Sequence, residues 1–250
     1  MWIPAWLGEI YARLSQRFGT EVFTLREAQD VLGMNEGKLN VAFSKLHSVR
    51  ILTLFERSRP RAYRLISPAD FVLLASEGVQ GIGGVRQERY VPLVLGAFRA
   101  VSDVVGLRSF ALYGSVARGT AKRNSDVDVL LVSDDFRGSI GRRIEELMSV
   151  EESLGDEIEW LHGKGVRAGL SFYPLRVSEA ERLPDLFLDL TEDAIILYDE
   201  GRLLERLLLE LRLRLMKDGA ERVYLDGGEW FWDLLPGYRH GDIIETDQVG

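Results

Sequence analysis

The stretch that most constrains this chain is residues 110–132, FALYGSVARGTAKRNSDVDVLLV. Its first apolar run, Phe110 to Tyr113, has the length and composition of a buried strand, which Gly114 ends. A short helix is expected after Gly114-Ser115, and the unpaired N–H groups of a first helical turn can contact an anion. A second strand is predicted from Asp126 to Val132. The stretch therefore predicts two strands joined by a turn that suits a phosphate group.

The second strand carries two carboxylates. Side chains two apart on a strand share a face, so Asp126 and Asp128 point the same way while Val127, Val129 and Leu131 face the core. Neighbouring carboxylates repel each other unless a cation lies between them. Mg²⁺ prefers oxygen ligands and shares them readily with phosphates. The pattern therefore predicts a metal-bound nucleoside triphosphate.

The spacing of these residues resembles a known signature. Gly114-Ser115, ten residues, then Asp126-x-Asp128 resembles the DNA polymerase β-like nucleotidyltransferase superfamily. The fuller pattern GSxARGxxxxxSDxD is similar to the minimal nucleotidyltransferases of archaea and bacteria. As a fold, the resemblance covers residues 88–175. The alternative interpretation is a surface turn followed by a capped strand with exposed aspartates.

The resemblance implies roles for individual residues. Asp126 and Asp128 would be catalytic and would bind Mg²⁺ (or Mn²⁺), and a nucleoside monophosphate would pass from an NTP to a hydroxyl acceptor. The acceptor could be a small molecule, a protein hydroxyl or a nucleic-acid end. Nucleotide binding would fall to Gly114, Ser115, Arg118, Gly119, Lys122 and Ser125. Arg118 fits equally well a salt bridge that locks the loop onto the acids, and Lys122 fits a solvated loop cation.

The chain departs from the family at one position. The family's third acid would be expected on a strand over residues 167–175, near position 171, where this sequence has Ser171. That acid normally positions the metal that activates the attacking hydroxyl. Nucleotide binding could survive its loss more easily than fast transfer. Other acids lie outside this strand, at Asp156, Glu157, Glu159, Glu179 and Glu181.

Composition describes an ordinary globular chain, with 46% hydrophobic and 28% charged residues among 250. No apolar run approaches the roughly 18 residues needed to span a membrane. Cysteine is absent, which excludes thiolate metal sites and suits a reducing cytoplasm. Residues 1–80 hold 10 Lys and Arg against 8 Asp and Glu, whereas residues 81–250 hold 21 against 31. Nucleic-acid contact is therefore favoured more at the front of the chain than across the acidic remainder.

The front of the chain shows three helical patterns, over residues 5–18, 24–32 and 35–47, and a hairpin with a basic tip over 51–66. This order resembles a winged helix-turn-helix over residues 1–78. The third helix would then enter a DNA groove while the hairpin reaches phosphates. The possible DNA contacts are Lys38, Lys45, Arg57, Arg59 and Arg61. The alternative is a protein-interaction or dimerisation module with a solvated tip.

The fold class expected is α+β. The divisions expected are a winged helix domain (1–78), a linker (79–85), a nucleotidyltransferase core with a small mixed sheet and flanking helices (86–183), and a helical C-terminal extension with a short hairpin (184–250). A leucine-rich helix over 201–217 is either central or a contact in a homodimer. The aromatic run 230–232 could stack a base, but such runs more often seal a core.

Three functions remain open at this point. The first is a nucleotidyltransferase. The second is a catalytically weakened, nucleotide-sensing transcriptional regulator that binds DNA through its winged helix. The third is an antitoxin that nucleotidylates a partner protein.

Overall fold

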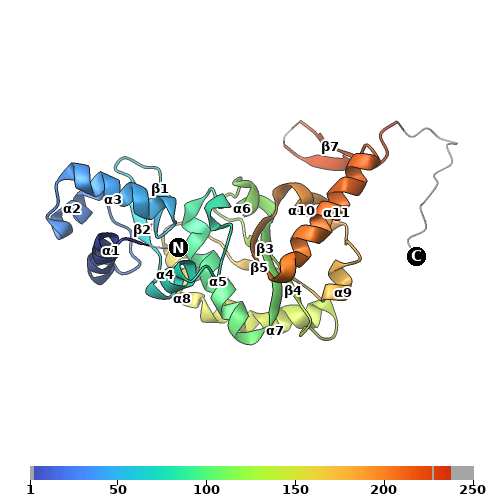
Figure 1. Cartoon of the computed structure of the whole chain (residues 1–250), viewed down its shortest axis with the longest axis horizontal. Helices are drawn as coiled ribbons and strands as arrows, with labels where there is room; N and C mark the ends of the chain where they lie inside the picture. Colours follow the sequence, from blue (N-terminus) through green and yellow to red (C-terminus); the bar gives the residue numbers. More distant parts are fainter. Residues whose placement is uncertain (1–2, 227, 238–250) are drawn as a thin grey trace.

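The computed structural model describes residues 3–226 and 228–237. Its N-terminal region has three helices and an antiparallel hairpin, as the patterns predict: α1 (Ala5–Phe18), α2 (Leu25–Leu32), α3 (Glu36–Ser48), β1 (Leu52–Glu56) and β2 (Ala62–Leu65). Thr24 and Glu27 form the expected capping box at the start of α2, and left-handed Gly33 ends the helix. This region forms one end of the molecule in Figure 1.

The connection to the sheet contains a helix that the patterns do not predict. It runs through α4 (Pro68–Ala75), η1 (Ile82–Gly84), η2 (Glu88–Tyr90) and α5 (Val91–Val104). The segment expected to be a linker, 79–85, packs against β6 (Ile195–Asp199), where the Gln80 N–H donates to the Leu197 carbonyl at 2.8 Å. Val79 and Ile82 are buried there. This segment therefore completes the packing of the sheet.

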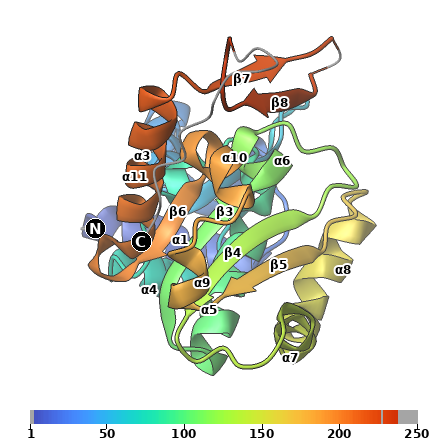
Figure 2. The same cartoon turned by 90° about the vertical axis from the view of Figure 1, so that its right-hand side faces the viewer.

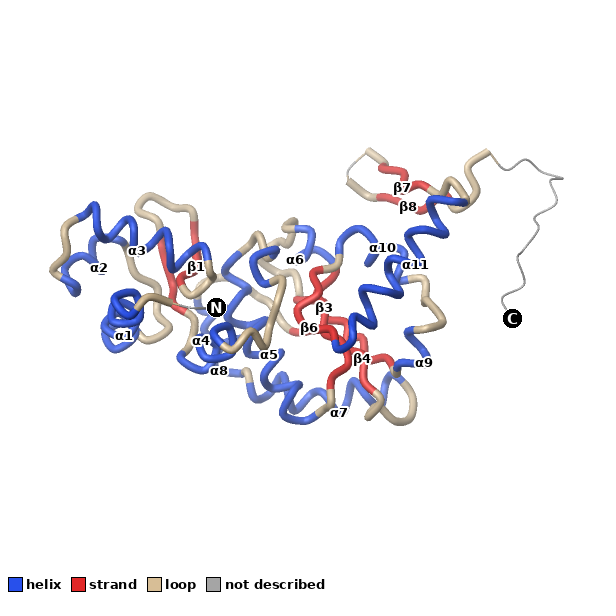
Figure 3. The backbone as a smooth tube through the Cα atoms, viewed as in Figure 1, coloured by secondary structure: helices blue, strands red, loops and turns tan. Residues whose placement is uncertain are grey.

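The central sheet is small and mixed, which confirms the predicted α+β class. It has the order β5-β4-β3-β6 and comprises, besides β6, the strands β3 (Leu107–Tyr113), β4 (Val127–Ser133) and β5 (Leu170–Leu175). The pair β4–β5 is parallel and the other two pairs are antiparallel. The register places Asp128 between Tyr113 on β3 and Ser171 on β5. The strands gather in the middle of the molecule with helices around them (Figure 3).

Helices cover both faces of this sheet. Val127, Val129 and Leu131 join the larger core with α5, α7 (Ile140–Ser153) and α8 (Gly155–Gly163). Leu130 and Val132 join a second core with α9 (Val177–Ala180), α10 (Leu186–Asp193) and α11 (Leu203–Lys217). Figure 2 shows these last three helices on the face turned toward the viewer. The central strand β4 is therefore apolar on both sides except at Asp128 and at its last residue, Ser133.

A hairpin of β7 (Glu221–Tyr224) and β8 (Trp230–Asp233) follows α11, as predicted. It lies above α10 and α6 (Gly114–Arg118) in Figure 2. None of the described helices combines the length and the apolar character that crossing a bilayer requires.

An interior ion pair joins the N-terminal region to the rest of the chain. Arg64 on β2, 1% exposed, donates to both carboxylate oxygens of Glu157 on α8 at 2.5 and 2.7 Å. Its guanidinium carbon lies 3.6 Å from the centroid of the Trp160 ring. It also donates to the Thr20 carbonyl. The two regions are thus joined by directional polar contacts as well as by apolar packing.

A second junction forms at Glu88, which is 7% exposed. One carboxylate oxygen accepts from Arg50 at 2.8 Å, and the other accepts from the Leu54 N–H at 2.7 Å. The His47 ring nitrogen lies 2.8 Å from the same carboxylate. Groups of the N-terminal region therefore compensate the negative charge of Glu88.

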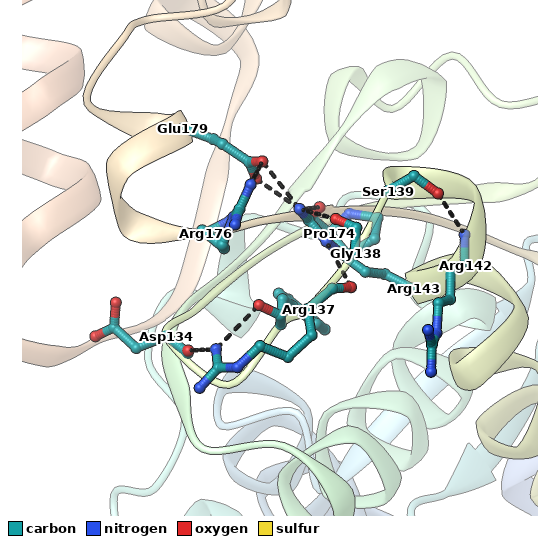
Figure 4. A network of polar contacts seen from close by, with 10 residues as sticks. Asp134, Arg137, Gly138, Ser139, Arg142, Arg143, Pro174, Arg176 and Glu179 are labelled. Atoms are coloured by element: carbon teal, nitrogen blue, oxygen red, sulfur yellow. Dashed lines mark hydrogen bonds and ion pairs between the residues drawn. The ribbon is translucent and has the colours of Figure 1, made fainter.

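Inside the sheet region, Arg143 anchors α7 to the end of β5. It is 1% exposed and donates to the two carboxylate oxygens of Glu179 at 2.5 and 2.9 Å. It also donates to the carbonyls of Pro174 and Gly138 at 3.0 and 2.7 Å. Figure 4 shows this network between α7, β5 and α9. Hydrogen bonds from Arg143 above all, and from Arg176, hold the Glu179 pKa well below its ordinary value.

Replacing Glu179 by glutamine should lower the free energy of unfolding at pH 7 by about 1.5–3 kcal/mol, since a charge-assisted hydrogen bond is lost. Because the folded-state pKa of Glu179 is depressed, its contribution is complete above the ordinary pKa of 4.5 and is lost as pH falls through the folded pKa. Urea unfolding at several pH values measures this. Glu146→Gln, in an exposed pair with Arg142, is the matched control and should cost under about 0.5 kcal/mol. An equal loss of stability in both variants would show that the Glu179 contacts stabilise the protein no more than an exposed ion pair does.

Candidate active site

The predicted turn joins β3 to α6 at Gly114. Gly114 has φ +68°, in the left-handed region, and a Cβ there would overlap Asp128 Oδ2. Gly119, with φ +77°, ends the five-residue helix, and its N–H bonds back to the Ser115 and Val116 carbonyls. The glycine at 114 therefore lets the turn and the carboxylate of the neighbouring strand lie in direct contact.

Replacing Gly114 by alanine should lower the free energy of unfolding by on the order of 2 kcal/mol, because an L-residue is strained at this φ and the added carbon displaces Asp128. Gly141→Ala in α7 is the control, since a Cβ there has nothing within 4 Å. That change should raise stability by up to about 1 kcal/mol, as glycine is a poor helix former. Urea unfolding of both variants measures the difference. If the free energy of unfolding of Gly114→Ala equals that of the wild type, the turn accommodates the added carbon.

Asp126 and Asp128 are brought together at the start of β4, as predicted. Asp126 Oδ1 accepts from the Gly169 N–H at 2.9 Å. Burial, first, and the nearby Asp126 charge, second, raise the pKa of Asp128. A hydrogen bond from Ser171 and the charge of Arg118 act in the opposite direction. The two carboxylates therefore repel each other in a partly dry site, which suits a cation and the oxygen ligands of Mg²⁺.

The expected position of a third acid holds Ser171, which lies next to Asp128 in the parallel ladder. Two of the other acids noted in the sequence form ion pairs elsewhere: Glu157 binds Arg64, and Glu179 binds Arg143. Over residues 3–226 and 228–237, no three His, Cys, Asp or Glu side chains are grouped so that they could hold a metal ion. The strand β5 therefore adds no carboxylate to Asp126 and Asp128.

Glu151 is a residue near this site that the sequence reasoning missed. Its Oε1 accepts from the Leu170 N–H at 3.3 Å. The position of a Cβ on Gly169 would be 3.0 Å from this oxygen and 3.3 Å from Asp126 Oδ1. Because Gly169 has no side chain, a carboxylate from α7 reaches the side of Asp126. Sequence offered no signal for this approach, because Glu151 looks like any polar residue on a helix.

Arg118 pairs with α10 rather than with the two carboxylates. Its Nη1 lies 3.5 Å from Asp193 Oδ2, and its guanidinium carbon lies 4.5 Å from the centroid of the Trp230 ring. Arg222, on β7, donates to the same Asp193 oxygen at 2.8 Å and lies 4.0 Å from the same ring. The C-terminal hairpin thus holds Arg118 beside the turn through Trp230.

The aromatic run of β8 packs against α10 through its two tryptophans. The Trp230 and Trp232 ring N–H groups both donate to Asp189 Oδ1, at 2.9 and 3.0 Å. Phe231 points to the other side of the hairpin and is 50% exposed. The two indoles therefore attach the hairpin to the body of the protein.

The loop between Gly119 and Asp126 is fixed at several points. Gln87 exchanges two hydrogen bonds with the backbone of Ala121, at 2.8 and 3.0 Å. The Tyr90 hydroxyl donates to the Lys122 carbonyl at 3.0 Å, and Ser125 Oγ accepts from the Lys122 N–H at 2.9 Å. The hydroxyl of Ser125 is thus part of the loop's own structure. The side chain of Lys122 is exposed.

The possible DNA contacts lie far from the acid pair in sequence but are all solvent-accessible. The exposed residues of this set are Lys38, Lys45, Arg57, Arg59 and Arg61. They come from α3 and from the loop that joins β1 to β2.

Comparison with known proteins agrees with this geometry. Residues 97–184 match the family model described as "Nucleotidyltransferase domain". This match spans β3, α6, β4 and β5, and it supports nucleotidyl transfer as the general function. No curated protein matches the chain.

Among solved structures, the chain is similar to one described as "Crystal structure of the toxin-antitoxin with AMP-PNP". The TM-score is 0.33 and the sequence identity 14%, over 50% of this chain and 92% of that chain. At this TM-score the likeness carries no functional information.

Proposed function

We propose that this protein transfers a nucleoside monophosphate from an NTP to a hydroxyl acceptor at the site formed by Gly114, Ser115, Asp126 and Asp128. The observation that carries the proposal is the contact between the turn and the acid pair, where only a glycine at 114 leaves room for the Asp128 carboxylate. The match of residues 97–184 to a nucleotidyltransferase domain supports it. A surface turn with exposed aspartates would not need this contact.

The chemistry follows from the chain's own groups. The backbone N–H groups and the hydroxyl of Ser115 bind phosphate oxygens, and Gly119 lets the chain turn closely after α6. Lys122, exposed on the adjoining loop, reaches the outer phosphates. Arg118, held by Asp193, adds a positive charge near Asp128. These groups stabilise the negative charge of the triphosphate without having to move far.

Asp126 and Asp128 would hold Mg²⁺ (or Mn²⁺), which when bound supplies charge neutralisation at the α-phosphate and the leaving pyrophosphate. In the transfer, the acceptor oxygen bonds to the α-phosphorus. The bond from that phosphorus to the bridging oxygen breaks, and pyrophosphate leaves with the electron pair. The hydroxyl proton passes to water. Ser171 beside Asp128 provides no carboxylate to take that proton, so transfer should be slow for a reaction of this class.

A second candidate function follows from Ser171. If transfer is too slow to matter, the site would bind a nucleotide without turnover, and the N-terminal region, read as a winged helix, would bind DNA as a regulator. The exposed cations of α3 and the β1–β2 loop favour this role. The two candidates differ in whether phosphorus leaves the NTP.

The experiment is incubation of the pure protein with each α-³²P-labelled NTP and Mg²⁺, with and without cell extract. Label on an acceptor, and its disappearance when EDTA removes the metal, is the expected result. Mg²⁺-dependent NTP binding by calorimetry without any transfer of label would favour the regulator instead. Absence of both binding and transfer would overturn the proposal.

A further inference from the structure

A cavity of about 430 Å³ lies between the N-terminal region and the nucleotidyltransferase part. One wall comes from the end of β1 and the residue after it, Glu56 and Arg57. The other wall comes from Arg86, Glu88, Arg89 and Gly119. Its volume is in the range of small-ligand sites. Neither part of the chain forms this cavity alone.

The charge of this cavity is positive. Glu88 is already balanced by Arg50 and His47, and Glu56 pairs with Arg123 at 2.7 Å. The walls contain three other cations, Arg57, Arg86 and Arg89. None of the three forms an ion pair within the part of the chain that the structure describes. Guanidinium groups bind phosphate oxygens with paired hydrogen bonds. The cavity therefore suits a phosphate group.

A second cavity, of about 220 Å³, lies in the N-terminal region next to the first one. Leu54 lines both cavities. The second is bordered by Asn40 and Ser44 from α3 and by Arg61 from the hairpin. The contact of His47 with Glu88 at 2.8 Å lies between the two spaces, because each of these residues lines one of them. Arginines line both cavities, Arg57, Arg86 and Arg89 in the first and Arg61 in the second, and this distribution favours a ligand with several successive phosphates over one with a single phosphate.

The first cavity reaches Gly119, at the end of the helix that begins beside Asp128. The side chain of Arg86 lies across Gly119, with its Cδ 3.0 Å from the position that a Cβ would take there. Gly119 follows α6, whose first residue, Gly114, contacts Asp128. Five helical residues span about 7.5 Å. The cavity and the acid pair therefore lie at the two ends of one short helix.

We propose that this interdomain groove binds the single-stranded end of a nucleic-acid acceptor. Its phosphates would contact Arg57, Arg86 and Arg89, and its terminal hydroxyl would face Asp126 and Asp128. The inference rests on the proposed function and names its acceptor. The N-terminal region then selects the substrate of the transfer reaction, because it supplies one wall of the groove and the surface that leads into it.

The test measures binding of fluorescein-labelled single-stranded RNA and DNA of about 12 nucleotides, a typical site length, to the full chain by anisotropy at several salt concentrations. Arg86→Ala/Arg89→Ala should weaken binding by about 10–100-fold at 100 mM salt. It should also lower the slope of log affinity against log salt by about 1.4, the value for two lost contacts to a single strand. NTP binding by calorimetry should not change.

The matched control is Arg142→Ala/Arg202→Ala, which removes the same charge from exposed arginines outside the groove. An equal loss of strand binding in the control would overturn the proposal. The weaker binding would then result from the lower net positive charge of the protein and not from contacts in the groove. Equal inhibition by a nucleoside monophosphate at the same phosphate concentration would also overturn it, since a small phosphorylated molecule would then be the ligand.

Strand binding and label transfer, measured on the same proteins, distinguish this proposal from the proposed function. Asp126→Asn/Asp128→Asn should bind the strand as the wild type does. Strand binding that depends on Arg86 and Arg89, but without transfer of label, would support the groove and reject the transferase. Transfer of label to a protein hydroxyl without strand binding would reject the groove and support the transferase.

Discussion

The double variant Asp126→Asn/Asp128→Asn should transfer labelled nucleotide at least about a thousandfold more slowly than the wild type. The two carboxylates are the ligands that the site offers to a metal, and metal stabilisation of a phosphoryl-transfer transition state contributes several kcal/mol. Each 1.36 kcal/mol corresponds to a factor of ten in rate. The rate of label transfer from α-³²P-NTP measures the loss.

This loss should occur without unfolding. Burial and the neighbouring Asp126 raise the pKa of Asp128, so the charged pair costs stability in metal-free buffer. An asparagine at 126 can still accept from the Gly169 N–H. The double variant should therefore melt at or above the wild-type temperature in EDTA. A variant that is both inactive and less stable would point to a structural role for the pair.

The control makes the same changes at the opposite end of β4, in Asp134→Asn/Asp135→Asn. Asp135 accepts from the Gly106 N–H at 2.8 Å, which an asparagine can also do. This variant has the same net charge and should keep the wild-type transfer rate. A similar loss there would assign the effect to charge on the whole protein.

Arg64→Met should lower the free energy of unfolding by about 3–5 kcal/mol, the cost of leaving one partner of an interior ion pair without the other. Arg64 is buried against Trp160 and meets Glu157 with two hydrogen bonds. Methionine keeps most of the apolar contact, so the loss should reflect the charge and its hydrogen bonds. Urea unfolding followed by circular dichroism measures the change.

Arg142→Met is the control for Arg64→Met, because Arg142 is 70% exposed and pairs with Glu146 on the surface. It should cost no more than about 0.5 kcal/mol. Glu157→Gln should recover part of the stability of Arg64→Met when the two are combined, since it removes the unpaired charge. Additive losses in the double variant would show that the pair does not act as a unit.

Local signals were enough to predict much of this fold. The capping box at Thr24 and the glycine at Gly33 are short-range patterns that mark the two ends of α2, and Gly114 directly follows the end of β3. The alternation along β4 predicted that Val127, Val129 and Leu131 enter the core, whereas the burial of Leu130 and Val132 in a second core was not predicted. The acid pair and its turn were predicted because all their residues lie within one short stretch.

The features that were missed depend on contacts distant in sequence. The sequence over residues 184–198 predicts a buried helix with a short extended end, but it does not show that this end, β6, pairs with β3 at one edge of the sheet. Glu151 reaches the site because Gly169 has no side chain. Arg118 is held by Asp193 and Trp230, from two elements that come much later in the chain. No local pattern in one sequence carries this information.

The pairing of β6 with β3 has a consequence for synthesis of the chain. Residues 97–184 contain only three of the four strands, so the edge of β3 stays unpaired until the ribosome has released residue 199. An unpaired edge is a template for association with other chains. Premature termination between residues 184 and 199 should therefore yield fragments that aggregate, although they contain every residue of the acid pair and its turn.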